Sequence, residues 1–234
     1  MRESVFKRID AAVASGECPV VVLDLDSTLF DTAGRHLQIL TEYAQTVQGE
    51  HPDLLARVQE LSHAEFGWSI RAPLDERGYR NEAALEGLNA FWFERFFTHD
   101  YVLHDLATPG AVSFVQEAHQ RGALVYYLTG RDVPGMGSGT AAALTQAGFP
   151  LWRGRCVLHL KPNFDMKDKP FKEAAMEDIR SHGGEVVATF ENEPGNANAF
   201  LEAFPEAEHY LVGNVHSPEA EPPNSRLKLI DDFR

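Results

Sequence analysis

The apolar run at residues 20–23, which leads directly into Asp24 and Asp26, constrains the fold more than any other feature of the sequence. Four consecutive aliphatic residues predict a strand that is buried on both faces, as in the interior of a parallel sheet. Open α/β sheets bind their ligands beyond the carboxyl ends of the strands, where the two aspartates lie. Two carboxylates this close repel each other unless a cation or an electron-poor group joins them. We therefore expect an acidic site at a sheet edge; the alternative is an ordinary loop with helix-capping polar residues.

Strands and helices alternate through the second half of the chain. Apolar segments predict further strands at residues 123–128, 156–160, 186–190 and 209–212. Helices are predicted before and between them, at residues 3–14, 110–120, 140–147, 170–182 and 194–204. Glycines at positions 135, 137 and 139 predict a mobile loop, and the proline-containing tail is expected to be irregular until its last apolar residues. This alternation predicts right-handed crossovers and a mostly parallel sheet with helices on both faces.

The segment between the first and second strands is too long for a simple crossover. Residues 32–104 predict helices and loops only. Because this insertion leaves from the carboxyl end of the first strand, we expect it to cover the acidic site as a cap. The predicted division is a core of residues 1–31 and 105–234 with a cap of residues 32–104. The aromatic run at residues 91–97 is expected to pack the cap helices, or alternatively to present one or two rings to the cleft.

Composition narrows the classes of partner. A net charge of −14 over 234 residues repels nucleic acid and anionic membranes. No apolar run reaches membrane-spanning length, and the acidic, amphipathic first residues do not resemble a signal peptide. Cys18 and Cys156 provide neither a disulfide framework nor a metal-ligand spacing. We expect a cytoplasmic protein that acts on a small molecule, with no prediction of its oligomeric state.

Three further polar clusters are expected at the same edge of the sheet as the two aspartates. Thr129, Gly130 and Arg131 follow the second predicted strand, and Glu191 follows the fourth. Lys169 and Lys172 lie at the start of a predicted helix. Magnesium prefers a few carboxylates together with water and a phosphate oxygen. A carboxylate can also attack phosphorus to form an aspartyl-phosphate, and phosphoryl transfer mainly requires positioning and charge neutralisation. The set therefore suits magnesium-dependent phosphoryl transfer.

In their order along the chain, these stretches resemble the four motifs of the haloacid dehalogenase-like (HAD) hydrolase superfamily. Residues 24–29 (Asp-Leu-Asp-Ser-Thr-Leu) match the first motif, and residues 128–131 (Leu-Thr-Gly-Arg) resemble the second. Lys169 or Lys172 resembles the third, and Glu191 the fourth. The resemblance implies a Rossmann-like, doubly wound parallel sheet of strand order 5-4-1-2-3, numbered along the chain, with a helical cap between motifs one and two.

The resemblance also implies roles for the residues of the first and fourth motifs. Asp24 would be the nucleophile and a magnesium ligand, and Glu191 the other side-chain ligand. Asp26 would be the general acid and base and would give its backbone carbonyl to the metal. The fourth motif usually carries two aspartates, whereas here Glu193 or Asn196 could share the metal or instead cap the helix that begins at residue 194.

The second and third motifs would bind the phosphoryl group. Thr129 would donate a hydrogen bond to it, with Gly130 and Arg131 beside it, and a lysine would balance its charge. Lys172 is slightly favoured over Lys169, and both remain open.

The acid at position 26 favours a phosphatase over a dehalogenase, because an alkoxide leaving group needs a proton and a halide does not. The expected function is therefore a magnesium-dependent phosphatase that hydrolyses a small phosphomonoester. The alternatives are a phosphotransferase or mutase that uses the same intermediate, and a non-catalytic binding protein that retains the fold.

Overall fold

A computed structural model of the chain describes residues 1–152, 154–213 and 215–234. Its centre is a six-stranded sheet of order β5-β4-β1-β6-β7-β8, in which all neighbouring strands are parallel. The strands are β1 Pro19–Leu23, β4 Leu124–Asp132, β5 Cys156–Lys161, β6 Glu185–Glu191, β7 Glu208–Val212 and β8 Lys228–Ile230. The five predicted strands have the predicted order. Strand β8 was not predicted from the sequence, and it adds an edge strand beside β7.

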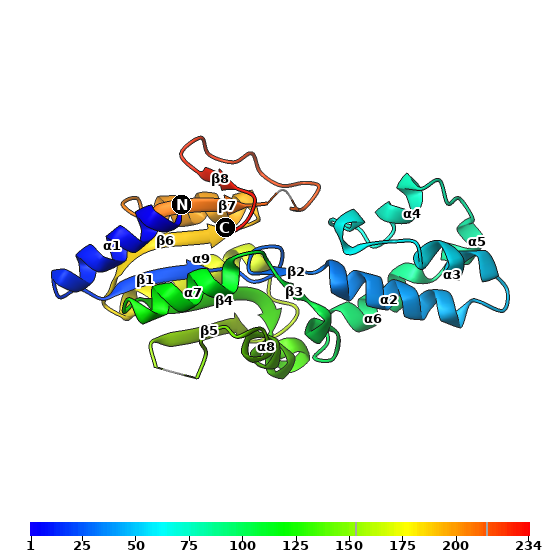
Figure 1. Cartoon of the computed structure of the whole chain (residues 1–234), viewed down its shortest axis with the longest axis horizontal. Coiled ribbons are helices and arrows are strands. Elements are labelled where there is room, and N and C mark those ends of the chain that lie inside the picture. The colour runs from blue at the N-terminus through cyan, green and yellow to red at the C-terminus, as the bar shows by residue number, and fades with distance from the viewer. Residues whose placement is uncertain (153, 214) are drawn as a thin grey trace.

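Helices cover both faces of this sheet (Figure 1). They are α1 Arg2–Ala14, α7 Ala111–Gln120, α8 Val133–Ala147, α9 Asp168–Ser181 and α10 Pro194–Ala203. Alternate residues of β1 enter different apolar clusters: Val21 packs with α1, α7 and α8, whereas Val22 packs with α9 and α10. All five residues of β1 are buried, which confirms that this strand lies in the interior of the sheet.

The predicted glycine loop is wrong, because α8 already begins at Val133 and contains these glycines. The Asp132 side chain caps the helix by accepting a hydrogen bond from the Gly135 backbone N–H at 2.8 Å. A Cβ atom at Gly139 would overlap the carbonyl oxygen of His99. Here the glycines allow the helix to pack closely against another segment, and they do not form a turn.

Residues 32–104 form a second group of helices, which lies beyond the ends of the strands in Figure 1. It leaves and returns through a short antiparallel pair, β2 Phe30–Asp31 and β3 Leu106–Ala107. Its helices are α2 Ala33–Thr46, α3 Pro52–Val58, α4 Ala72–Glu76, α5 Glu82–Leu85 and α6 Leu88–Phe96, with 3-10 turns η1 His63–Glu65 and η2 Tyr101–His104. We call residues 32–104 the helical insertion. It has an apolar cluster of its own, separate from the clusters on the sheet.

None of the helices described in the structure combines the length and the apolar character that crossing a membrane would require.

Candidate active site

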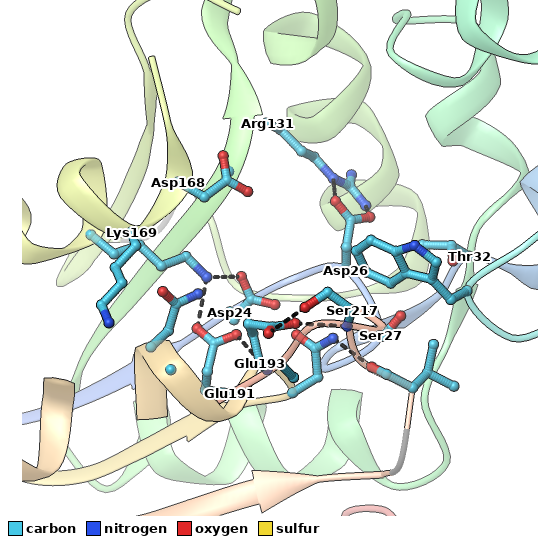
Figure 2. A pocket seen from close by; sticks show the side chains of 18 of the residues that line it. Asp24, Asp26, Ser27, Thr32, Arg131, Asp168, Lys169, Glu191, Glu193 and Ser217 are labelled. Carbon is cyan, nitrogen blue, oxygen red and sulfur yellow. Dashed lines mark hydrogen bonds and ion pairs between the residues drawn. The ribbon is translucent and has the colours of Figure 1, made fainter. Parts of the chain in front are cut away.

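Asp24, Glu191 and Lys172 meet at the carboxyl edge of the sheet. Asp24 directly follows β1 and Glu191 ends the adjacent strand β6, so parallel pairing brings the two carboxylates to the same place. Lys172 lies on the buried face of α9 and donates from Nζ to Asp24 Oδ1 at 2.6 Å and to Glu191 Oε2 at 2.7 Å. In Figure 2, dashed lines join both carboxylates to the same nitrogen atom.

This triad holds two carboxylates against one ammonium group and is almost closed to water. Burial and the nearby charge of Glu191 raise the pKa of Asp24 to about 7, although Lys172 acts in the opposite direction. Burial would lower the pKa of Lys172, but Asp24 and Glu191 outweigh it and raise that pKa above its usual range. The two carboxylates carry more negative charge than the one ammonium group balances, so the triad is suited to binding a further cation. Among the described residues, no group of three or more His, Cys, Asp or Glu side chains forms a metal-binding cluster.

Asp26 belongs to a different set of charges, although it lies only two residues from Asp24. Arg131 binds it with two nitrogens, at 3.1 Å to Oδ2 and 2.7 Å to Oδ1, and Arg35 donates to Oδ1 at 3.0 Å. Both arginines also bind the fully buried carboxylate of Asp105. We call Asp26, Arg35, Arg131 and Asp105 the arginine cluster. It contains two carboxylates and two guanidinium groups.

The arginine cluster favours the ionised form of Asp26. Burial would raise the pKa of this carboxyl, but the charges of Arg131 and Arg35 outweigh it and hold the pKa well below its usual range. The side chain nevertheless remains 36% exposed, so one side of the carboxylate faces the cavity.

The residues of the second motif lie at the same edge but differ in access. Thr129 is fully buried, and its Oγ1 accepts a hydrogen bond from the Arg131 backbone N–H at 3.2 Å. Gly130 lines the cavity, and a Cβ atom there would overlap the Asp168 carboxylate. The guanidinium group of Arg131 is occupied by Asp26 and Asp105.

The two candidate lysines near the start of α9 lie in different surroundings. Lys172 reaches the triad, whereas the Lys169 ammonium is partly exposed and pairs with Glu221. A third lysine, Lys161, is also buried, and it donates to Asp168 Oδ1 at 2.8 Å.

Glu193 anchors a neighbouring loop. Its carboxylate accepts from the Ser217 hydroxyl at 2.7 Å and from the Ser217 backbone N–H at 3.0 Å, as Figure 2 shows. Its own backbone N–H donates to Glu191 Oε1 at 3.1 Å. Asn196 is buried in the first turn of α10 and lines the cavity.

Above these polar groups lies a cavity of about 610 Å³. The polar triad is on its core side, and its other lining includes aromatic residues of the helical insertion and of the β5–α9 loop: Trp68, Trp92, Phe96, Phe97 and Phe164. Part of the aromatic run at residues 91–97 therefore packs the insertion, while Trp92, Phe96 and Phe97 also face the cavity.

Arg35 and Asp105 were not predicted from the sequence as site residues. They lie near the two junctions of the insertion with the core and meet only in the folded chain, where Arg35 Nε donates to Asp105 Oδ1 at 2.9 Å. The sequence indicates them only weakly, because each is a single charged residue near one junction.

Comparison with known proteins agrees with this geometry. Residues 18–189 match the model of the haloacid dehalogenase-like hydrolase family. The chain belongs to this family of hydrolases. No protein with a curated description matches the sequence.

Solved structures resemble this HAD-family chain at low sequence identity. A candidate phosphatase from Clostridium difficile superimposes with a TM-score of 0.53 and 12% identity, covering 87% of this chain and 89% of that one. A candidate beta-phosphoglucomutase from Bacteroides vulgatus gives a TM-score of 0.48 and 18% identity, covering 98% and 92%.

Proposed function

We propose that this HAD-family hydrolase is a magnesium-dependent phosphatase that hydrolyses a small phosphomonoester through an aspartyl-phosphate on Asp24. The observation that carries the proposal is the convergence of Asp24, Glu191 and Lys172 at the open edge of the sheet. A nucleophile, a second carboxylate and a fixed ammonium are the groups that phosphoryl transfer requires.

Asp24 and Glu191, with the backbone carbonyl of Asp26, would hold Mg²⁺. Their oxygen donors and the excess negative charge of the triad fit a hard divalent cation. When bound, the ion would neutralise charge on the transferring phosphoryl group.

The protein's own groups divide the remaining steps. A carboxylate oxygen of Asp24 would attack phosphorus as the bond to the substrate alcohol breaks, and Lys172 would offset the charge on the phosphoryl oxygens. Water then attacks the aspartyl-phosphate, which releases phosphate and restores Asp24. Ionised Asp26 would accept the proton of that water. Before the first step, Asp26 must loosen its contacts with the two arginines and take up a proton from solvent, which it then gives to the leaving alkoxide.

We further propose that residues 32–104 form a cap on a core of residues 1–31 and 105–234. The separate apolar cluster of the insertion and its two-stranded connection, β2 with β3, support this division. The unpaired thiols of Cys18 and Cys156 support a reducing compartment such as the cytoplasm.

The proposal is tested by phosphate release from a panel of phosphomonoesters, with Mg²⁺ or with a chelator, for the wild type and Asp24→Asn. We expect release that requires both the metal and Asp24. Added acceptor alcohols would reveal transfer in place of hydrolysis. Unchanged turnover in a folded Asp24→Asn variant would contradict the proposal.

A further inference from the structure

Trp68 is the most unusual of the aromatic side chains that line the cavity. It lies in the helical insertion between η1 and α4 and is 55% exposed. Within the part of the chain that the structure describes, its ring stacks on no other ring and its N–H has no hydrogen-bond partner. An open indole face at the wall of a cavity provides a surface on which a flat ring can stack.

The other rings form a continuous wall that spans the insertion and the core. Trp92 contacts Phe97 with ring centroids 5.5 Å apart, and Phe97 contacts Phe164 at 5.1 Å. Phe164 belongs to the loop between β5 and α9 and is itself 42% exposed. The cavity therefore has aromatic surface contributed by both parts of the molecule, next to the triad.

The charges around the cavity exclude a second acidic group on the ligand. Among the described lining residues, four are Lys or Arg and eight are Asp or Glu. Each of the four cations is already bound to a carboxylate: Arg131 to Asp26, Lys161 to Asp168, Lys169 to Glu221 and Lys172 to Asp24. No lining cation among the described residues is left to bind a carboxylate or a second phosphate on the body of the substrate.

From this combination we infer that the substrate is a phosphomonoester whose body is a flat aromatic ring system without further negative charge, held against Trp68 and the Phe97–Phe164 wall. This inference rests on the proposed phosphatase function and narrows its substrate class. A cavity of about 610 Å³ leaves room for such a body beyond the phosphoryl group. A nucleoside and a simple aryl or benzyl group share this chemistry, and the experiment below distinguishes them.

The test compares pairs of substrates that differ in the aromaticity of one ring, in the presence of an aromatic base, or in charge. Benzyl phosphate is paired with cyclohexylmethyl phosphate, since both release a primary alcohol, and adenosine 5′-monophosphate is paired with ribose 5-phosphate. A third pair, benzyl and 4-carboxybenzyl phosphate, tests the exclusion of charge. We expect kcat/KM to be about 10-fold or more higher for the aromatic, uncharged member of a pair. Preference in the first pair alone identifies a simple aryl body, and a larger preference in the second identifies a nucleoside.

Variants of Trp68 test whether the aromatic lining of the cavity causes the preference for aromatic substrates. Trp68→Ala should reduce the aromatic preference severalfold, mainly through KM, whereas Trp68→Phe should retain most of it. Trp152→Ala is the matched control, because Trp152 is 75% exposed and lies outside the cavity. The preference must remain unchanged in this control.

The outcomes separate the two proposals. Asp24-dependent release that is equal within each pair, or a preference that survives Trp68→Ala, would overturn the aromatic substrate class and leave the phosphatase in place. If no ester is hydrolysed, the phosphatase proposal fails. Calorimetric binding of the same pairs to Asp24→Asn then decides the ligand class: equal affinity within the pairs overturns it, and tighter aromatic binding supports it.

Discussion

Asp24 and Asp26 are separated by one residue, yet they lie in opposite electrostatic surroundings. The Asp24 triad has two carboxylates and one ammonium, and burial with this excess negative charge raises the pKa of Asp24. The arginine cluster around Asp26 has two carboxylates and two guanidinium groups. The positive charges of Arg131 and Arg35 lower the pKa of Asp26. An unbalanced site has capacity for another cation, whereas a balanced one holds its members in place. We attribute nucleophilic attack and metal binding to the first site, and we propose that the second site holds Asp26 in position for proton transfer.

Removing the ammonium group from the triad tests the difference between the two sites most strongly. Lys172→Met should lower kcat by about 10²–10⁴-fold, because no other group of the triad is positively charged. Lys169→Met is the matched control, since Lys169 pairs with Glu221 at the surface, and it should retain nearly normal turnover. Steady-state kinetics on one phosphomonoester compares the two. Equal losses would show that the triad does not depend on Lys172.

Removing a guanidinium from the arginine cluster should instead cost stability. Arg131→Met leaves the carboxylates of Asp26 and Asp105 with Arg35 as their remaining partner, and we expect a loss of about 3–5 kcal/mol in the free energy of unfolding. Urea denaturation measures it. Arg71→Met, which breaks exposed ion pairs with Asp75 and Glu82, should lose much less. A similar small loss for both variants would contradict a structural role for the cluster.

Substitutions of the two glutamates at the end of β6, Glu191 and Glu193, should separate metal binding from loop anchoring. Glu191→Gln should weaken the apparent Mg²⁺ affinity by about 10-fold or more, because it removes charge from the triad. Glu193→Gln should leave that affinity nearly unchanged, since its amide oxygen can still accept from Ser217. The increase in melting temperature with added Mg²⁺ measures the affinity independently of activity. A larger effect at Glu193 would reverse the assignment.

A smaller, pH-dependent effect is expected at His36, which packs beneath the aromatic wall with Trp92 and Phe96. Burial and the charge of Arg35 lower its pKa from 6.5 to about 3, although Asp26 acts in the opposite direction. Between pH 6.5 and about pH 3, His36 is therefore protonated in the unfolded chain but neutral in the folded chain. Stability should fall by at most about 1.4 kcal/mol per pH unit through this window as the pH decreases. Urea titrations of His36→Phe should show a shallower fall, and parallel curves would contradict this origin.

The sequence predicted what depends on local pattern. Contiguous apolar runs located the five strands, and the rule that ligands bind at their carboxyl ends brought Asp24 and Glu191 together. The choice between the lysines depended on helix phase. Lys172 lies in register with Ala175 and Met176 on the buried face of α9, a spacing already visible in the sequence.

Other features depend on tertiary contacts that no local pattern records. Arg35 and Asp105 are 70 residues apart and are joined only when the insertion closes on β2 and β3. The glycines of α8 have a turn-like composition, but Gly135 and Gly139 allow close packing against Phe97 and His99. For the same reason, the sequence could not show which aromatic rings face the cavity.

The most direct test of the central claim is to trap the covalent intermediate. The wild type would be mixed with a hydrolysed phosphomonoester and Mg²⁺, quenched in acid within milliseconds, and mapped by peptide mass spectrometry. We expect one added phosphoryl group on the peptide that contains Asp24, and none in Asp24→Asn treated identically. A phosphoryl group on any other residue, or steady turnover with an intermediate that never appears on Asp24, would contradict the division of roles between the two aspartates.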